Sequence, residues 1–369
     1  MAKKKLNVAM IGIGFMGRAH SNALLQVNRY FDTGFDLRMK VVCGRELART
    51  EAFAARWGWE DVATHWEEVV GRKDVDAVDI VLPNALHAPV AIAAAQAGKI
   101  VLCEKPLAMN AAESRAMVEA AAKVPTLVWF NYRRVPAVLL AKKLIEEGRV
   151  GHVYHYRAKY LQSWGVEAPD SWRFRASEAG SGALGDLLAH SVDLAMLLNG
   201  DVQEVTSIQK TFSREREVDD AVAVLARFAN GSVGTLEATR FASGRLNGNT
   251  FEINGAKGAL RFDLEDMNVL EFFDNTEGAE TSGWRQIYVT DAAHPQVGKF
   301  WPPGHIVGYE HTFIITLAEF LDALAAGNEF HPNFEDGDRV QQVLDSVSRS
   351  ALARAWQSPG GAPDPLPVD

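Results

Sequence analysis

Strand-length apolar runs alternate with helix-compatible stretches over the first 130 residues of the chain. Five of these runs are predicted strands: 6–11, 37–43, 75–82, 100–102 and 127–130. Three of the stretches between them are predicted helices: 18–27, 46–57 and 87–97. Strands that alternate with helices of this length form βαβ units and therefore a parallel sheet. The pattern predicts an α/β domain of the doubly wound kind.

The pattern changes after residue 150, where strand-period alternation takes over. In the run 153–161 the tyrosines at 154, 156 and 160 share one face of the predicted strand. Further strands are predicted at 218–228, 232–240, 250–253, 259–262, 269–273 and 285–289, with Asn230-Gly231 as a hairpin signal. Helices are predicted at 136–147, 180–200, 310–326 and 337–356. This half reads as an antiparallel meander, which predicts an α+β domain with a large, mostly antiparallel open sheet.

The length of 369 residues agrees with two domains, and we place them at 1–131 and 132–369, with the C-terminal helices free to pack back on the first. The net charge of −9 argues against nucleic acid or an anionic membrane surface as a partner. No apolar run approaches the ~20 residues that cross a bilayer. Two cysteines, Cys43 and Cys103, are too few for a disulfide framework and favour a reducing compartment. We expect a cytoplasmic protein with a small-molecule partner.

The first predicted strand runs directly into Gly12, Gly14 and Gly17, which form a G-x-G-x-x-G motif before a predicted helix. The first glycine allows the tight turn, the second lets a pyrophosphate approach the backbone, and the third allows close helix–strand packing. Phe15 and Met16 lie between these glycines. The motif predicts a dinucleotide site, with these five residues at the cofactor.

The second strand is followed by Gly44 and Arg45 rather than by the acidic residue that reads the ribose 2′-hydroxyl of NAD. A small residue before an arginine leaves room for a 2′-phosphate, whereas Glu46 can still serve the hydroxyl. The residues therefore leave NAD and NADP both open, with Gly44 and Arg45 as the expected ribose contacts.

Polar residues follow three further predicted strands, at the edge where open α/β sheets bind ligands. Glu104 and Lys105 precede Pro106, and a lysine at this place can reach a reacting oxygen; the alternative is a solvated Glu-Lys pair. The other residues expected at the cofactor on this edge are Pro83, Asn84, His87 and Asn131. His87 is equally compatible with a plain helix-start residue.

The helix predicted at 180–200 is apolar except for Asp186, His190 and Asp193, which share one face. Such a stripe is most often a solvent-facing side, yet it contains no Lys, Arg or Glu. An Asp one turn before a His can orient and charge an imidazole base. His152 and His155 do not form a metal pair, because a spacing of three puts them on opposite faces of a strand, and we expect no metal site.

The motif GIGFMG, the segment CEKP and the D-x-x-x-H helix together resemble the Gfo/Idh/MocA oxidoreductase family over essentially the whole chain. The resemblance implies that Lys105, Asp186 and His190 form the catalytic set. It also implies a homodimer or homotetramer whose subunits meet at the open sheet. Within the family, YLQSW, SWRF and FANGSVGTLEATR look most like the levoglucosan dehydrogenases and related sugar 3-dehydrogenases, whereas WPPGHIVGYEHTF departs from that pattern.

The same resemblance suggests which residues surround the nicotinamide ring. Trp172 and Arg173 are expected at the cofactor. The residues expected at the substrate are Tyr132, Arg133, Gln162, Trp164 and His305. Indoles beside amide, imidazole and guanidinium groups suit a pyranose, whose apolar face can lie on an aromatic ring. Trp164 and Trp172 are also compatible with core or subunit contacts, and Arg173 with an anionic sugar.

Three functions remain in competition. The first is an NAD(P)-dependent dehydrogenase that oxidises a secondary hydroxyl of a sugar, anhydrosugar or cyclitol, with His190 as base and Lys105 stabilising the alkoxide. The second is a glycoside-cleaving enzyme that uses bound NAD transiently through a 3-keto sugar. The third, a cofactor-binding regulator, is disfavoured because all three catalytic residue types are present.

Overall fold

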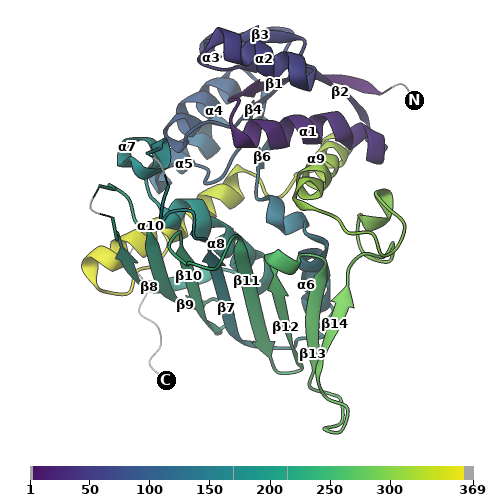
Figure 1. Ribbon diagram of the computed structural model, residues 1–369, viewed down its shortest axis with the longest axis vertical. Coiled ribbons are helices and arrows are strands. Elements are labelled where there is room, and N and C mark those ends of the chain that lie inside the picture. The colour runs from purple at the N-terminus through teal and green to yellow at the C-terminus, as the bar shows by residue number, and fades with distance from the viewer. Residues whose placement is uncertain (1–2, 169, 214, 361–369) are drawn as a thin grey trace. The chain divides into compact units, whose positions relative to one another are not determined.

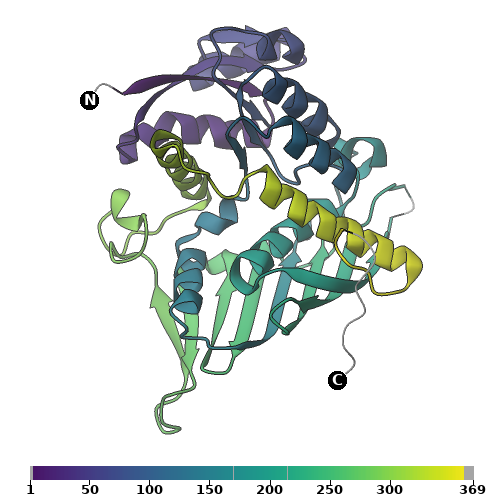
Figure 2. The ribbon, with the colours of Figure 1, turned by 180° about the vertical axis from the view of Figure 1, so that it is seen from behind.

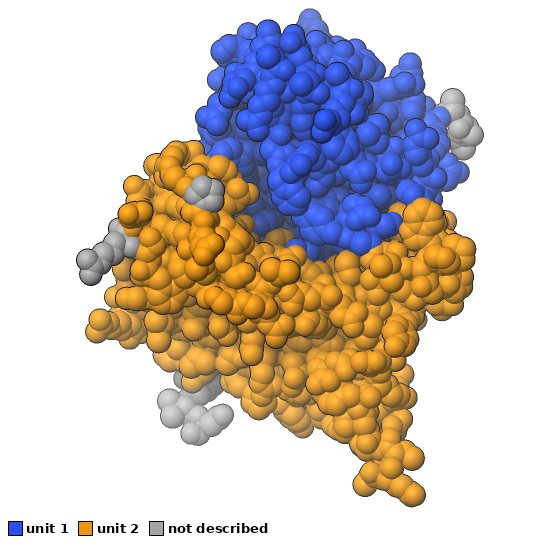
Figure 3. Space-filling view, in the orientation of Figure 1, with its two compact units in different colours: residues 1–134, 308–338 blue, residues 135–307, 339–369 orange. Residues whose placement is uncertain are grey.

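A computed structural model describes residues 3–168, 170–213 and 215–360 (Figure 1). It divides the chain into two compact units, each made of two separate stretches of chain (Figure 3). Unit 1 comprises residues 1–134 and 308–338, and unit 2 comprises residues 135–307 and 339–369. Helix α10 (Phe334–Ala353) therefore begins in one unit and ends in the other.

Unit 1 contains a six-stranded parallel sheet in the order β3-β2-β1-β4-β5-β6. Its strands are β1 (Lys4–Ile11), β2 (Phe35–Cys43), β3 (Asp61–Ala63), β4 (Ala77–Ile80), β5 (Ile100–Cys103) and β6 (Thr126–Val128). The predicted parallel sheet is confirmed. The strand order reverses between β1 and β4, and in sheets of this kind the ligand crevice lies at that reversal.

The helices of unit 1 flank this sheet (Figure 1). They are α1 (Phe15–Tyr30), α2 (Leu47–Trp57), α3 (Trp66–Val70), η1 (Asn84–Leu86), α4 (His87–Gln96), α5 (Ala111–Ala120), η2 (Asn131–Arg134) and α9 (Tyr309–Ala326). Helix α9 packs against α1, so a segment near the C-terminus completes this unit. Elements β3 and α3 were not predicted, because three and five residues are too few to show a period. Helix α5 was also missed.

Unit 2 contains an eight-stranded sheet in the order β14-β13-β12-β11-β7-β10-β9-β8. Its strands are β7 (Val153–Leu161), β8 (Val202–Lys210), β9 (Ala221–Phe228), β10 (Val233–Thr239), β11 (Gly248–Gly255), β12 (Gly258–Asp263), β13 (Val269–Asp274) and β14 (Trp284–Tyr288). The mostly antiparallel open sheet is confirmed. The predicted meander holds for β8–β9–β10 and for β11–β12–β13–β14, but β7 lies between these two groups and interrupts it. Among the described strands of this sheet, β7 and β10 form the one parallel pair, because the long connection after β7 returns the chain at the far edge as β8.

Strand β7 alternates as predicted at Tyr156, Ala158 and Tyr160, which are buried, but Tyr154 is 52% exposed. The pairing with β11 shifts at this point, so the register skips Tyr154. Such a bulge turns a side chain away from the face that the period of two assigns to it. The prediction that all three tyrosines share one face is therefore wrong at Tyr154.

The buried face of this sheet is covered by helices, as the view from behind shows (Figure 2). Helix α6 (Pro136–Glu146) packs on β12 and β13, and α8 (Ala189–Asn199) packs on β7. The remaining helical segments of this unit are η3 (Trp172–Phe174), α7 (Ala176–Ala179), η4 (Leu184–Leu188), η5 (Leu264–Asp266) and η6 (Val297–Lys299). The opposite face carries exposed apolar side chains such as Leu225 and Val233. Assembly of subunits through that face stays a prediction.

The stretch Ala176–Asn199 is, within the described residues, the one helical segment long and apolar enough to cross a membrane by length and composition. This qualifies the expectation that no run approaches that length. Its most apolar window is 78% buried inside the structure, and Gly180, at φ 74°, ends α7 so that continuous helix begins only at Ala183. The segment is the core helix of unit 2.

Candidate active site

The glycine motif of unit 1 joins β1 to α1 in the geometry that a dinucleotide requires. Gly12 has φ +117°, and a Cβ there would lie 2.3 Å from the carbonyl oxygen of Val81. At Gly17 a Cβ would lie 2.7 Å from the Gly12 carbonyl oxygen, which explains the close packing of helix on strand. Gly14 precedes the first turn of α1, where no side chain caps the helix and open space surrounds its Cα. The free N–H groups of that turn fit a pyrophosphate.

The end of β2 leaves no room for an acidic residue. A Cβ on Gly44 would lie 2.5 Å from Oγ1 of Thr50 and 3.0 Å from a methyl carbon of Ile13. The Thr50 hydroxyl is itself held by a hydrogen bond of 2.8 Å to the carbonyl oxygen of Glu46. Arg45 and Glu46 are exposed. The side chains of Arg45 and Glu46 are therefore the accessible ones at this turn, and a bound ribose could contact them.

The strand end after β5 is built around a buried charge cluster. The carboxylate of Glu104 contacts Nε2 of His20 at 3.0 Å, and the other ring nitrogen of His20 contacts Asp79 at 2.9 Å. The indole of Trp129 donates to the second oxygen of Asp79 at 2.9 Å, and the backbone N–H of Lys105 donates to the second oxygen of Glu104 at 3.0 Å. The predicted solvated Glu-Lys pair is thus wrong for Glu104, which is 5% exposed. Lys105 itself is half-buried.

The predicted cofactor residues after β4 are largely enclosed. His87 is fully buried, with Nδ1 2.9 Å from the carbonyl oxygen of Pro106 and Nε2 2.9 Å from that of Leu82. Burial lowers the pKa of His87, although both carbonyl oxygens oppose the shift. Asn84 is buried and Pro83 is half-buried. His87 thus connects the turn after β4 to the segment that follows Lys105.

Tyr309, the first residue of α9, links two predicted parts of the site in unit 1. Its ring stacks on Phe15 at 6.2 Å between centroids, and its hydroxyl lies 3.9 Å from the sulfur of Met16. The same ring meets Tyr132 edge-on at 6.4 Å. Phe15 is 56% exposed at the start of α1. The glycine motif and η2 are therefore brought together through a residue that lies almost 180 positions later in the chain than Tyr132.

The other two predicted residues of η2 are buried. Asn131 donates from Nδ2 to Oγ1 of Thr312 on α9 at 2.9 Å. Arg133 is 6% exposed, and its guanidinium lies 3.9 Å from the carboxylate of Asp336. Direct contact of a ligand with Phe15 or Tyr309 is therefore better supported than contact with the buried side chains of Asn131 and Arg133.

In unit 2 the helix that carries Asp186 and His190 is started by a carboxylate from another part of the chain. Asp219 accepts hydrogen bonds from the backbone N–H groups of Gly182 at 2.7 Å and Leu184 at 2.8 Å. A Cβ on Gly182 would lie 1.7 Å from the Asp219 carbonyl oxygen, so only glycine fits there. Burial raises the pKa of Asp219, while the two N–H groups and Arg240 act in the opposite direction.

The polar stripe on this helix is buried rather than solvent-facing. His190 is 5% exposed and Asp193 is 1% exposed, while the Asp186 side chain keeps 26% of its surface accessible. Asp186 lies on η4, a π-helical turn, and His190 follows in the first turn of α8. Turns of this type occur often at functional sites because they shift side chains out of the regular α-helical register. The interpretation as a solvent-facing stripe is wrong.

A buried arginine holds the Asp186 carboxylate. Arg240 is 1% exposed and donates to Oδ2 of Asp186 at 3.0 Å and to the carbonyl oxygen of Gly182 at 3.2 Å. Its guanidinium also lies 4.9 Å from the ring centre of Trp164 and 5.9 Å from that of Phe174. A hydrogen-bonded guanidinium stabilises the negative charge of the carboxylate that it contacts. Asp186 is thereby supplied with a fixed cation.

A chain of polar groups links the predicted substrate residues of unit 2. The indole N–H of Trp164 donates to Oε1 of Gln162 at 2.6 Å, and Nε2 of Gln162 donates to Oδ1 of Asn247 at 2.7 Å. The hydroxyl of Tyr160 donates to the same Asn247 oxygen at 2.8 Å. The Tyr160 ring lies 5.8 Å from the ring of His190. Gln162 and Trp164 therefore stand on the same side of the sheet as His190.

The remaining predicted residues of unit 2 are not part of the hydrogen-bonded series Trp164–Gln162–Asn247–Tyr160. Arg173 and Trp172 are half-buried on η3, with the guanidinium 4.6 Å from the ring centre of Trp172. The backbone oxygen of Arg173 is also 3.4 Å from the Arg240 guanidinium. His305 is exposed in the loop before α9, and its Nδ1 lies 3.0 Å from the carbonyl oxygen of Pro302.

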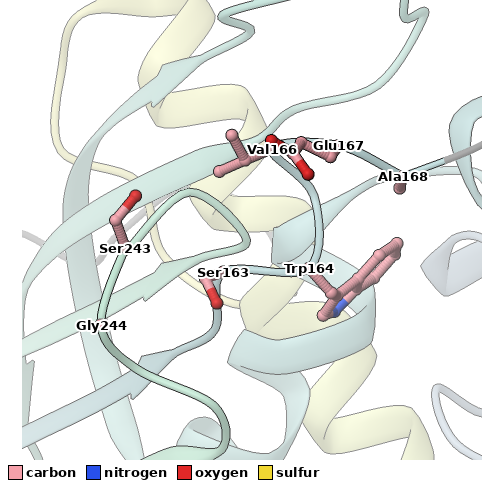
Figure 4. A pocket seen from close by; sticks show the side chains of 7 residues that line it. All are labelled: Ser163, Trp164, Val166, Glu167, Ala168, Ser243 and Gly244. Carbon is pink, nitrogen blue, oxygen red and sulfur yellow. The ribbon is translucent and has the colours of Figure 1, made fainter.

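Trp164 also borders an open cavity of about 540 Å³ in unit 2 (Figure 4). Two loops form it, one after β7 and one after β10. Its lining residues are Ser163, Trp164, Val166, Glu167, Ala168, Ser243 and Gly244. Of the residues predicted at the site, Trp164 alone is among these.

Several residues of these two clusters were missed from the sequence. His20, Asp79, Asp219, Arg240 and Asn247 each act through a partner that lies at least 33 positions away in the chain. The sequence held a weak indication of Arg240, because this residue ends the segment FANGSVGTLEATR, which contributes to the family resemblance. Among the described residues, no three His, Cys, Asp or Glu side chains gather as they would around a metal ion.

Comparison with known proteins decides the family. Residues 6–132 match the oxidoreductase family with an NAD-binding Rossmann fold, and residues 138–261 match the Gfo/Idh/MocA C-terminal domain. The chain belongs to the Gfo/Idh/MocA oxidoreductase family. It is 40% identical to levoglucosan dehydrogenase of Pseudarthrobacter phenanthrenivorans, over 96% of this chain and 98% of that one. It is 25% identical to inositol 2-dehydrogenase of Rhizobium meliloti, over 94% and 96%.

Solved structures of the family agree with this assignment. A levoglucosan dehydrogenase in complex with NADH and levoglucosan superimposes with a TM-score of 0.95 at 41% identity, over 97% of this chain and all of that one. An oxidoreductase domain protein from Kribbella flavida gives a TM-score of 0.94 at 46% identity over the same shares. The present chain is thus an NAD-binding dehydrogenase of the Gfo/Idh/MocA family, and its glycine motif lies within the part of the chain that matches the NAD-binding domain.

Proposed function

We propose that the protein oxidises a secondary hydroxyl of a sugar, an anhydrosugar or a cyclitol to a ketone. The observation that carries the proposal is the position of buried His190 one helical turn after Asp186, whose carboxylate accepts a hydrogen bond of 3.0 Å from the Arg240 guanidinium. An imidazole next to a carboxylate with a fixed charge suits a general base. The names of the relatives, levoglucosan dehydrogenase and inositol 2-dehydrogenase, support the substrate class.

Each residue has one role in the proposed reaction. Loss of a hydride from carbon requires loss of a proton from the hydroxyl, and His190 takes that proton. Asp186 orients the imidazole and stabilises its positive charge, while Lys105 stabilises the negative charge that develops on the substrate oxygen. NAD, when bound at the glycine motif, supplies the hydride acceptor.

A panel of sugars, cyclitols and glycosides tests this proposal, with NADH and organic products both measured. Net formation of one NADH for each ketone supports the dehydrogenase. Cleavage of a glycoside through many turnovers without net NADH would replace it with the redox-neutral reaction. Binding of NAD without turnover of any substrate would favour a regulator.

The turn after β2 gives a prediction about the cofactor. We propose that NAD is the cofactor used, and that Arg45 is the residue that allows NADP as well. Replacing Arg45 with alanine should weaken NADP binding about tenfold, because a charge-assisted hydrogen bond to the 2′-phosphate is lost. Binding of NAD should change by less than about twofold, since its 2′-hydroxyl carries no charge. Dissociation constants for the reduced cofactors, from the fluorescence of NADH and NADPH, measure both effects.

The matched control for this variant is Arg49→Ala, which removes another exposed arginine in the first turn of α2, six positions after the end of the same strand. It should leave both dissociation constants unchanged. Equal weakening of NAD and NADP by Arg45→Ala would show that this turn does not read the ribose.

A second prediction concerns the substrate pocket, to which we propose that Gln162 and Trp164 of unit 2 contribute. Trp164→Ala should raise the substrate KM at least several-fold, because a sugar loses the aromatic face that its apolar side covers. Gln162→Ala should act similarly, since it removes the amide that orients Trp164. The NAD dissociation constant should remain nearly the same. Steady-state kinetics and NAD titration give both quantities.

Tyr154→Ala is the matched control, since it removes an exposed aromatic ring from the same sheet at the displaced position of β7. It should leave KM unchanged. If Trp164→Ala weakens NAD and substrate binding equally, or prevents folding, Trp164 belongs to the core and not to the pocket.

A further inference from the structure

His20 is buried between two carboxylates and belongs to no step of the proposed reaction. It is fully inaccessible on α1, with Asp79 at 2.9 Å from Nδ1 and Glu104 at 3.0 Å from Nε2. The rings of Trp129 and Phe313 pack on it at 4.2 and 5.4 Å between centroids. Both ring nitrogens therefore face a carboxylate oxygen inside an apolar shell.

This geometry fits two protons on the ring when both carboxyls are ionised. A neutral imidazole has one N–H and one lone pair, so a neutral His20 would point a lone pair at a carboxylate oxygen. An imidazolium instead donates from both nitrogens. The other oxygens of the two carboxylates accept from the Trp129 indole and from the Lys105 backbone N–H. With a charged ring, each carboxylate oxygen has a donor, and a fully satisfied buried network is stable and rigid.

The electrostatic balance agrees with the hydrogen bonds. Burial acts to lower the pKa of His20, but Asp79 and then Glu104 outweigh it and raise the pKa to about 9. The titratable groups that contact the ring are these two carboxyls, Asp79 from β4 and Glu104 after β5. Trp129 after β6 and Phe313 on α9 complete its surroundings without titratable groups of their own.

The cluster ends at the backbone of Lys105. One oxygen of Glu104 accepts a hydrogen bond from the imidazolium, and the other accepts one from the Lys105 N–H at 3.0 Å. One residue further, the carbonyl oxygen of Pro106 is 2.9 Å from Nδ1 of the buried His87. The peptide unit before Lys105 is thus linked to His20 through Glu104, and the peptide unit after Pro106 contacts His87.

We propose that His20 is a positioning residue, an imidazolium charged at neutral pH that clamps Glu104 and thereby fixes the backbone from which Lys105 extends. This inference rests on the role proposed above for Lys105. His20 does not touch substrate or cofactor; its effect passes through Glu104.

The protonation state of His20 can be measured without any assay of activity. In the full-length protein labelled with ¹⁵N- and ¹³C-histidine, one of the ten histidines should show two slowly exchanging ring N–H protons at pH 7.5. The signal should be absent from the His20→Gln variant, and it should titrate only near pH 9. A neutral His20 ring at pH 7.5 would overturn the proposal.

Kinetics separate positioning from mere stability. His20→Gln should lower kcat about tenfold or more, because a small displacement of a catalytic group is costly, while KM and NAD affinity change by less than about threefold. The matched control is Trp59→Phe, which removes a buried hydrogen bond of 3.1 Å to Ser21, the next residue of the same helix. It should lower the Tm yet leave kcat unchanged. Equal kcat values for His20→Gln and the unaltered protein would also overturn the proposal.

The stability of the protein should depend on pH through this residue. His20 has a pKa near 6.5 when unfolded and about 9 when folded, so its stabilisation is complete below pH 6.5 and is lost as pH rises through 9. The midpoint of denaturant unfolding should therefore fall between pH 6.5 and 9 in the unaltered protein and fall less in His20→Gln. Parallel pH curves for the two proteins would contradict a charged His20.

The two proposals fail in different ways. If Lys105→Met keeps full turnover, the role of Lys105 is wrong, whatever the charge on His20. If Lys105→Met is inactive and the His20 ring is neutral at pH 7.5, the clamp alone is wrong.

Discussion

Replacing His190 with asparagine should lower kcat by about 10²-fold or more, the scale at which a lost general base acts. Asparagine keeps a polar group of similar size in a site where His190 is 5% exposed, but it cannot accept a proton. The cofactor dissociation constant should change little, because His190 acts on the substrate hydroxyl. Steady-state formation of NADH, with NAD titrated separately, measures both quantities.

The neighbouring Ser191→Ala change supplies the control. Ser191 is 1% exposed on the same helix, and its hydroxyl makes no hydrogen bond within the described structure. Its loss should leave both folding and turnover close to those of the unaltered protein. Near-normal turnover by His190→Asn would remove His190 from the mechanism.

Replacing Lys105 with methionine should also lower kcat by about 10²-fold or more, because the positive charge that stabilises the developing alkoxide is lost. Methionine preserves most of the length and the apolar part of the side chain. The backbone N–H that Glu104 accepts is unaffected by the change, so the clamp through His20 should remain intact. The same NADH assay measures the effect, with circular dichroism to show that the fold is kept.

Lys123→Met tests whether any lost lysine has this effect. Lys123 is exposed in the turn after α5, and its replacement changes the net charge by the same amount. We expect normal turnover from it. A similar loss of activity in the Lys123 and Lys105 variants would point to net charge rather than to a catalytic ammonium.

The cofactor half of the site was predicted best, because its signals are local. Gly12, Gly14 and Gly17 lie within six consecutive positions of one turn. In the structure a Cβ would clash with the backbone at Gly12 and Gly17, whereas the Cβ position at Gly14 is open space. The parallel sheet followed from the alternation of strands and helices. At Gly44 the structure adds a reason that the sequence does not show, since the Thr50 hydroxyl lies where a Cβ would stand, and room for a 2′-phosphate at this turn stays a prediction.

For the proposed catalytic half, the sequence shows the spacing of the residues but not their surroundings. The spacing of Asp186 and His190 is visible along the chain, since four positions bring two side chains to one face of a helix. Whether that face is exposed to solvent or buried depends on which elements cover it. The cover includes β7 and the segment around Arg240, which lie more than twenty positions before Asp186 and more than fifty after it.

The sequence by itself determined the order of elements, the dinucleotide turn, the family and the residue types that carry the chemistry. Those features rest on periods of two to four residues and on short motifs, which need no knowledge of distant segments. The tertiary structure decided the parallel pairing of β7 with β10, the cation at Asp186 and the two carboxylates around His20. Pairing order and charge environment arise from contacts between residues tens of positions apart, and burial makes those contacts strong. For that reason the charge on His20 and the ion pair at Asp186 became visible only once the chain was folded.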